Sequence, residues 1–401
     1  MDPADPGCLR LSGAKVLRDG GLTEGTVVIR GGRIVDEAEA GRTLDLSGLW
    51  ILPGIIDLHG DGFERHLAPR RGVVSDLNRR LRAVETELAS CGITTAWLAQ
   101  FWSWEGGMRS PDFASRLVKS VDEDRASRRL DLRVQLRLET HMVDAGEEIC
   151  SLVRAHRVDY VVFNDHLPHE HLRSGRRPPR LQGSALKAHR APEAHLAEMH
   201  RLVAQGPLVP AFLTGLSAEL RKSGVVLGSH DDADGARTSR DVPGPVISEF
   251  PVTVGAAEQA RRSGQPVVMG APNVVRGGSH SRGISCRPLI EAGLVDALAS
   301  DYHYPSLIDA ALSLAGDRAA PTGATSATDP SGLAEAWALI SRNPAAIMGL
   351  SDRGSIQTGL RADLVVFDPA IRSVVATFVN GRAAHLSGKV ADRLLRDASA
   401  G

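Results

Sequence analysis

Ile51-Leu-Pro-Gly-Ile-Ile-Asp-Leu-His-Gly-Asp61 is the stretch that decides the fold of this chain. The apolar run Leu49–Leu58 predicts a buried β-strand, and two polar residues, His59 and Asp61, follow it directly. Residues i and i+2 of an extended strand project to the same side, so both side chains can reach one ion. An imidazole and a carboxylate together suit zinc, manganese or iron. Alone, however, such a pair is more often two ordinary polar residues at a strand end, so other strand ends must supply further ligands.

The middle of the chain alternates apolar strands with segments of helical period, which is typical of a parallel α/β sheet. About eight strand-then-helix units follow one another, and this number predicts a (β/α)8 TIM-like barrel with its active site at the C-terminal ends of the strands. The alternative is an open doubly wound sheet, but no Gly-x-Gly-x-x-Gly follows a strand and opens a helix. The expected helices are Asp76–Ser90, Pro111–Ser127, Glu193–Gln205, Val252–Ser263 and Pro305–Ala315.

Both ends of the chain are rich in short β-strands. Gly31-Gly32 near the N-terminus and Asn380-Gly381 near the C-terminus each lie between two β-rich runs and predict hairpins. Because the two termini of a domain often lie close together, we expect residues 1–53 and 356–401 to form one small composite β-sandwich domain. The barrel then spans residues 54–355. Two unrelated terminal appendages are the alternative.

Bulk composition is that of an ordinary globular protein, with 42% hydrophobic and 24% charged residues among 401. A formal net charge of −1 gives no reason to expect a nucleic acid or an anionic membrane as partner. The four dispersed cysteines are typical of reduced thiols, and the acidic N-terminus lacks the features of a signal peptide. We therefore expect a soluble cytoplasmic protein, with a homodimer among the open alternatives for its assembly.

Candidate metal ligands lie at the ends of the expected strands. In a barrel these ends converge on one mouth, whereas other histidines, such as His156 and His385, are scattered. The pattern predicts a site for one or two divalent ions, with zinc first and manganese or iron as alternatives. His166 competes with its neighbours Asp165, His169 and His171, any of which could be the ligand. The predicted ligands are His59, Asp61, Glu139, His166, His230 and Asp301.

Such a site predicts hydrolysis. A divalent ion lowers the pKa of a bound water from about 16 towards 7. Asp301 is the expected catalytic residue, which takes the proton of that water and passes it to the leaving group. A Glu139 carboxylate with its two oxygens could bridge a pair of ions.

Basic and polar residues close to the expected ligands indicate a phosphorylated small-molecule substrate. One group follows the His59/Asp61 pair, and a second follows the seventh strand in the segment Asn273–His280. Guanidinium, imidazole and hydroxyl groups bind phosphate through charge-assisted hydrogen bonds. A solvated surface turn is the alternative for each group. The predicted substrate-binding residues are Arg65, His66, Arg70, Asn273, Arg276, Ser279 and His280. The segment 168–192 is polar and basic, and predicts a mobile loop over the mouth.

Several motifs resemble those of the amidohydrolase superfamily. They are Leu52-Pro-Gly-Ile-Ile-Asp-Leu-His-x-Asp61, Ser300-Asp301, Asn343-Pro-Ala-Ala and Gly359-Leu-Arg-Ala-Asp-Leu-Val-Val-Phe-Asp368. This resemblance implies a metal-dependent hydrolase barrel with a small composite β-domain. A Glu139 in place of a carbamylated lysine is similar to the N-acetylglucosamine-6-phosphate deacetylase branch.

Within the superfamily, the chain resembles the phosphonate-use hydrolases of the carbon–phosphorus lyase pathway. The matching stretches include His59–Val73, Asn164-Asp-His-x-Pro168 and Met269–His280. The resemblance implies cleavage of ribose 1-methylphosphonate 5-triphosphate to the 5-phosphate and pyrophosphate. Gly60 and Gly62 depart from the Thr and Asn that are usual in that family. A C–N hydrolase of the same fold, such as a deacetylase or deaminase, and a scaffold without catalysis are the alternatives.

Overall fold

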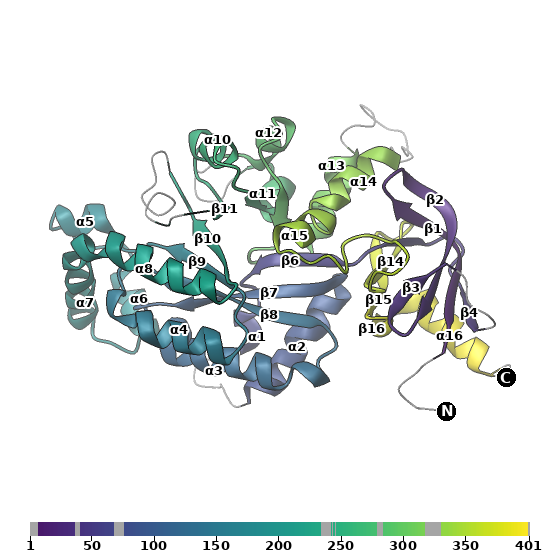
Figure 1. Cartoon of the computed structure of the whole chain (residues 1–401), viewed down its shortest axis with the longest axis horizontal. Helices are drawn as coiled ribbons and strands as arrows, with labels where there is room; N and C mark the ends of the chain where they lie inside the picture. The colour runs from purple at the N-terminus through teal and green to yellow at the C-terminus, as the bar shows by residue number, and fades with distance from the viewer. Residues whose placement is uncertain are drawn as a thin grey trace.

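The computed structural model describes residues 7–36, 41–67, 76–233, 242, 244, 246–278, 284–316 and 330–399. Two eight-stranded sheets organise this part of the chain, one parallel and one built from both ends of the sequence. Figure 1 shows the sheet of the two ends on one side of the molecule, and helices α5, α6 and α7 on the opposite side of the parallel sheet.

The parallel sheet has its strands in sequence order, and each strand pairs in parallel with the next. Apolar runs such as Tyr160–Asn164 are buried throughout, as expected for parallel strands covered on both faces. The strands are β6 (Ile55–Gly60), β7 (Ile93–Trp102), β8 (Asp131–Glu139), β9 (Tyr160–Asn164), β10 (Val226–His230), β11 (Ile247–Glu249), β12 (Val267–Gly270) and β13 (Ala297–Ala299).

The first and last strands close this sheet into a barrel. The backbone N–H of Asp301 donates to the carbonyl of His59 at 2.9 Å, and that of Asp61 donates to the carbonyl of Asp301 at 2.8 Å. At the other end of the strands, residues 339–340 lie between them, because Ile340 accepts from β6 and Leu339 accepts from β13. The predicted (β/α)8 barrel is therefore confirmed.

Helices follow the strands and cover the barrel. Asp76 caps α2 by accepting from the backbone N–H groups of Asn78 and Arg79, and Ser110 caps α3 ahead of Pro111 at its first position. The apolar faces of these helices join one large core with the strands. The helices around the barrel are α1 (Glu64–Leu67), α2 (Leu77–Ser90), α3 (Pro111–Glu123), α4 (Gly146–Ala155), α8 (Val209–Lys222), α10 (Val254–Arg262), α11 (Ala271–Arg276), α12 (Cys286–Glu291), α13 (Ser306–Gly316), α14 (Pro330–Ala338) and α15 (Arg342–Ile347).

The expected loop over residues 168–192 is wrong, because this segment forms two short helices. They are α5 (His169–Arg173) and α6 (Leu181–Lys187), and α7 (Pro192–Ala204) begins directly afterwards. The three helices enclose a small core of their own that includes Leu172, Leu181 and Met199. Its apolar residues are few and far apart in a basic segment, so no helical period was visible in the sequence.

Both ends of the chain form the second sheet, as predicted. Strand β14 pairs antiparallel with β5, so Val366 lies opposite Ile51. Alternate residues of these strands, such as Leu364 and Val366, fill one apolar core that also includes Val390 of α16 (Gly388–Ser399). The strands are β1 (Leu9–Arg18), β2 (Gly21–Arg30), β3 (Arg33–Val35), β4 (Arg42–Asp45), β5 (Trp50–Pro53), β14 (Leu364–Asp368), β15 (Ser373–Val379) and β16 (Arg382–Leu386).

The domain boundaries at residues 53/54 and 355/356 stay a prediction. Among the described residues, no helix has the length and apolar character that crossing a membrane requires.

Candidate functional site

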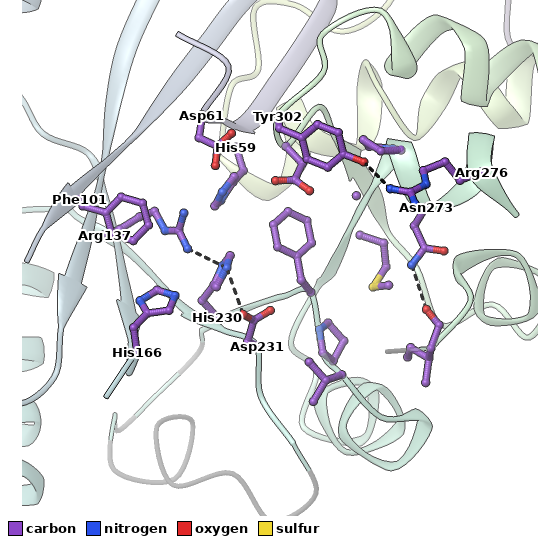
Figure 2. A pocket seen from close by; sticks show the side chains of 18 of the residues that line it. His59, Asp61, Phe101, Arg137, His166, His230, Asp231, Asn273, Arg276 and Tyr302 are labelled. Atoms are coloured by element: carbon purple, nitrogen blue, oxygen red, sulfur yellow. Dashed lines mark hydrogen bonds and ion pairs between the residues drawn. The ribbon is translucent and has the colours of Figure 1, made fainter. Parts of the chain in front are cut away.

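A cavity of about 320 Å³ lies at the C-terminal ends of the barrel strands (Figure 2). Side chains from β6, β8 and β10 and from the segments that follow β9, β11, β12 and β13 surround it. The predicted site residues that line the cavity are His59, Asp61, His166, His230, Asn273, Arg276 and Asp301.

His59, Asp61 and Asp301 form the group that best fits a divalent ion. One ligand atom from each lies within 4.8 Å of the other two. Nε2 of the His59 ring is buried and has no hydrogen-bond partner among the described residues. A buried imidazole nitrogen beside two carboxylates matches the ligands that zinc and related ions take. These three residues therefore fit the predicted metal, and they come from the first and last strands of the barrel.

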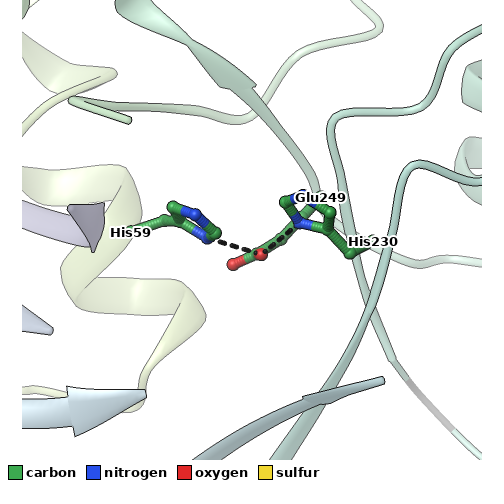
Figure 3. A group of neighbouring side chains, drawn as sticks. All are labelled: His59, His230 and Glu249. Atoms are coloured by element: carbon green, nitrogen blue, oxygen red, sulfur yellow. Dashed lines mark hydrogen bonds and ion pairs between the residues drawn. The ribbon is translucent and has the colours of Figure 1, made fainter. Parts of the chain in front are cut away.

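Glu249 fixes the orientation of His59 from the opposite side (Figure 3). Its Oε2 lies 2.9 Å from Nδ1 of His59 and 3.2 Å from Nδ1 of His230, while its Oε1 accepts from Gln135 and Tyr160, each at 2.6 Å. Burial alone raises the pKa of Glu249, but the two imidazoles lower it below its usual range. An ionised carboxylate with four donors holds each ring with Nδ1–H towards it, which leaves Nε2 of His59 available as a ligand.

His230 contacts Arg137 through its Nε2 and does not contact the carboxylates of Asp61 and Asp301 through that atom. An Arg137 Nη2–H donates to Nε2 of His230 at 2.8 Å, and the His230 ring stacks on that of His59 at 5.1 Å. Burial and the nearby Arg137 charge lower the pKa of His230 to about 4, so this imidazole is neutral at pH 7. The structure brings His230 together with His59 and Glu249, one ligand atom of each lying within 4.8 Å of the other two, while Arg137 contacts its Nε2.

Glu139 contacts His166, another predicted ligand, and its own role as a ligand stays a prediction. Its Oε1 accepts from Nδ2 of Asn164 at 2.5 Å and lies 2.5 Å from Nδ1 of His166, and its Oε2 accepts from the His166 backbone at 3.1 Å. Glu139 therefore orients His166, which lines the cavity. The competing residue Asp165 points to His169 and His141 instead.

Three residues at the mouth adopt the left-handed backbone region that favours glycine. They follow β10, β11 and β13, with φ of 57° at Asp231, 51° at Phe250 and 55° at Asp301. Such conformations cost of order 1–3 kcal/mol each and persist only where the surroundings impose them. At Asp301, the two backbone hydrogen bonds to β6 impose it. Residues with positive φ also occur elsewhere, but three beside one cavity support a functional role for this end of the barrel.

Arg65 and His66 are not brought into the cavity. Both side chains form ion pairs with Glu87 of α2, and Arg65 also lies over the ring of Tyr304 at 5.4 Å. The carboxylate of Glu87 holds both side chains at the helix layer, and neither residue lines the cavity within the described part of the chain. Arg70, Ser279 and His280 lie outside the described residues.

The two remaining predicted substrate contacts differ in how much of their side chain is available. Asn273 lines the cavity, but its amide donates to the carbonyl of Ile284 and accepts from the N–H of Cys286, each at 2.9 Å. It therefore holds the chain that follows α11. Arg276 is exposed at the mouth, where its Nη1 contacts the Tyr302 hydroxyl at 3.3 Å.

Sequence reasoning missed three residues of the site. Arg137 lies two residues before Glu139 on the same strand face, so the i, i+2 rule could have found it. Glu249 ends a strand in the same way as the predicted ligands. Arg109 follows β7 in a polar turn, and its guanidinium lies 4.0 Å from the Phe101 ring centroid, as does that of Arg137. Nothing in the local sequence of Arg109 indicates this placement.

Comparison with known proteins gives a relative that spans almost the whole chain. Alpha-D-ribose 1-methylphosphonate 5-triphosphate diphosphatase of Escherichia coli (strain K12) is 31% identical over 369 residues, which covers 89% of this chain and 94% of the relative. Residues 255–385 match the model of the amidohydrolase family.

Solved structures share the fold at low identity. The β-aspartyl dipeptidase of Fervidobacterium islandicum AW-1 superposes with a TM-score of 0.58 at 14% identity, covering 95% of this chain and 97% of its own. An adenosine deaminase from Xanthomonas campestris, with bound zinc, gives 0.52 at 15% identity, covering 98% and 97%. With a relative of 31% identity along nearly its full length, a strand order that closes a barrel and these structural neighbours, the chain belongs to the amidohydrolase family of hydrolases.

Proposed function

We propose that the chain hydrolyses a phosphoanhydride bond of a ribosyl triphosphate, namely alpha-D-ribose 1-methylphosphonate 5-triphosphate, and releases pyrophosphate. The relative from Escherichia coli carries that substrate in its name. The observation that carries the proposal is a buried guanidinium, that of Arg137, which faces the same cavity as His59, Asp61 and Asp301. A polyphosphate carries several negative charges, so its oxygens can be bound by the guanidinium and by a metal ion at the same time.

Arg137 is a buried cation that forms no direct ion pair with another described residue. Its residue is 4% exposed, and its Nε has no hydrogen-bond partner among the described residues. Its one hydrogen bond in that part of the chain goes to the neutral ring of His230. Burial lowers the pKa of Arg137 although the carboxylates of Asp61, Glu249 and Asp231 oppose this, so an anionic ligand in the cavity is a natural further partner.

Two further arginines extend this positive surface along the cavity. Arg109 pairs with Glu105 at 2.7 Å and keeps its guanidinium against the Phe101 ring, and Arg276 stands at the mouth beside Tyr302. Guanidinium groups bind phosphate oxygens in pairs and remain charged at all relevant pH values. A substrate with several linked phosphates can therefore contact more than one of them.

His59, Asp61 and Asp301 are the residues that would hold a divalent ion, with zinc as the proposed metal. Such an ion supplies Lewis-acid polarisation of a phosphoryl oxygen and lowers the pKa of water from about 16 towards 7. Glu249 holds the His59 ring in place through Nδ1. The Asp301 carboxylate takes the proton of the attacking water and returns it to the departing pyrophosphate oxygen.

The test is hydrolysis of ribosyl and nucleoside triphosphates by metal-reconstituted protein, with pyrophosphate and orthophosphate measured separately. Pyrophosphate release from the ribosyl triphosphate is the expected result. Release of orthophosphate only contradicts the proposal. Rapid cleavage of amides without turnover of any triphosphate contradicts it as well and favours the C–N hydrolase. A small phosphorylated molecule as partner and a cytoplasmic location are parts of the same proposal.

A further inference from the structure

A second group of imidazole and carboxylate side chains lies outside the cavity. His141 follows β8, Asp165 follows β9, and His169 is the first residue of α5. One ligand atom of each lies within 4.8 Å of the other two. None of these three described residues lines the cavity that holds His59. We call this group the His141 cluster.

Both imidazoles of the His141 cluster face the same carboxylate oxygen. Oδ1 of Asp165 accepts the backbone N–H of Leu167 at 3.1 Å, which fixes the carboxylate. Its Oδ2 then lies 2.7 Å from Nε2 of His169 and 3.7 Å from Nδ1 of His141. The centroids of the two rings lie 5.1 Å apart. Burial alone raises the pKa of Asp165, but the two histidines lower it below its usual value. An ionised carboxylate is thus held between two imidazoles.

The spacing of these atoms is close to that of a zinc site. Zinc holds imidazole nitrogen and carboxylate oxygen at about 2.0–2.2 Å, so neighbouring ligand atoms of a tetrahedral site lie roughly 3.3 Å apart. The separations of 2.7 Å and 3.7 Å lie on either side of that value. The shorter one is a hydrogen bond, whose proton a metal ion displaces on binding. The longer one exceeds hydrogen-bond length, and Nδ1 of His141 also lies 3.2 Å from Oγ1 of Thr140, a contact that an ion at this site replaces.

We propose that His141, Asp165 and His169 bind a divalent transition-metal ion, zinc by the nature of the ligands, separate from the proposed catalytic ion. A water molecule completes the four-coordinate site. The ion joins the end of β8 to the first turn of α5. It thereby fixes the start of the helical segment α5–α7, which lies next to His166 at the mouth of the cavity.

The experiment counts metal ions bound to the full-length protein. The chain is stripped with a chelator, incubated with zinc, desalted and analysed by elemental mass spectrometry. His169→Ala is expected to hold one equivalent less than the unchanged protein. His171→Ala, which removes a histidine of the same helix outside the cluster, is the matched control and is expected to hold the full number. Asp165→Asn provides a second variant with the same expected loss, should His169→Ala fold poorly.

A second arm separates this site from the proposed catalytic one. His59→Ala removes the ligand at the cavity, so the equivalent that remains belongs to the His141 cluster and must disappear when His169→Ala is added. Zinc is likewise expected to raise the melting temperature of His59→Ala and not that of the double variant. Equal zinc content in His59→Ala and the double variant overturns the proposal and leaves the His141 cluster as a hydrogen-bonded network only.

Discussion

The two ends of the barrel differ in whether their buried charged and polar groups have hydrogen-bond partners. At the N-terminal end, Asp131 accepts from Arg133 at 2.8 Å and from Arg353 at 2.7 Å, and Arg353 also donates to Thr95 at 2.9 Å. At the C-terminal end, Nε2 of His59 and Nε of Arg137 are buried without a hydrogen-bond partner among the described residues.

This difference separates stability from function within one barrel. A satisfied buried network contributes to folding, and removal of one member leaves an uncompensated charge. Unsatisfied buried polar groups cost free energy in the protein alone, and a ligand that completes them recovers that cost. Changes at the Asp131 end are therefore expected to alter the free energy of unfolding, and changes at the His59 end to alter binding and turnover.

The largest expected effect is on turnover, from Asp301→Asn. Asparagine tolerates the left-handed backbone at this position, so the fold is kept, while the group that takes the proton is lost. We expect kcat to fall by about 10³-fold. Steady-state pyrophosphate release measures this, with Asp309→Asn on α13 as the exposed control. An Asp301→Asn protein within tenfold of normal kcat rules out the proposed role.

At the opposite end, Asp131→Asn is expected to lower the free energy of unfolding by about 1–3 kcal/mol, because it removes the carboxylate that Arg133 and Arg353 share, while each keeps a second one in Asp159 and Asp352. Those two arginines lower the pKa of Asp131 although burial opposes them. Its stabilising contribution is therefore present above about pH 4 and is lost as the pH falls through the lowered pKa. Urea unfolding at pH 7 and at pH 3 measures this difference, which must shrink in acid. The kcat of the folded variant should be unchanged.

Arg137→Gln sharpens the contrast, because it removes a buried charge that has no direct ion pair among the described residues. We expect KM for the triphosphate to rise about 10- to 100-fold, from the loss of a charged hydrogen bond to phosphate. The melting temperature should stay level or rise, in contrast to Asp131→Asn. A marked loss of stability with unchanged KM would show that Arg137 is structural.

The smallest effect is expected from Arg65→Ala. This side chain is half exposed and pairs with Glu87 outside the cavity, and exposed ion pairs contribute about 0–1 kcal/mol. Its KM should therefore change by less than about twofold, compared with Arg137→Gln in the same assay. A tenfold rise in KM would restore Arg65 as a substrate contact.

The sequence predicted the framework because buried parallel strands are continuous apolar runs. The eight barrel strands lie on or close to those apolar runs. Asn380-Gly381 forms the predicted turn between β15 and β16. The segment 168–192 escaped prediction because its helices are short and its apolar residues sparse. There, tertiary contacts with Trp104 and Leu202 decide the conformation.

The site was predictable to the level of strand ends and no further. That His59, Asp61 and Asp301 lie together follows from their positions on β6 and after β13. Which partner a long side chain selects does not follow from position. Glu139 contacts Asn164 and His166, and Arg65 pairs with Glu87.

The backbone bridge between His59 and Asp301 has a consequence for biosynthesis. The imidazole comes from the first barrel strand to leave the ribosome, and the carboxylate follows the last. An incomplete nascent chain therefore has no assembled centre, whatever portion of it has already folded. Hydrolysis therefore requires the complete barrel, in which the first and last strands have paired.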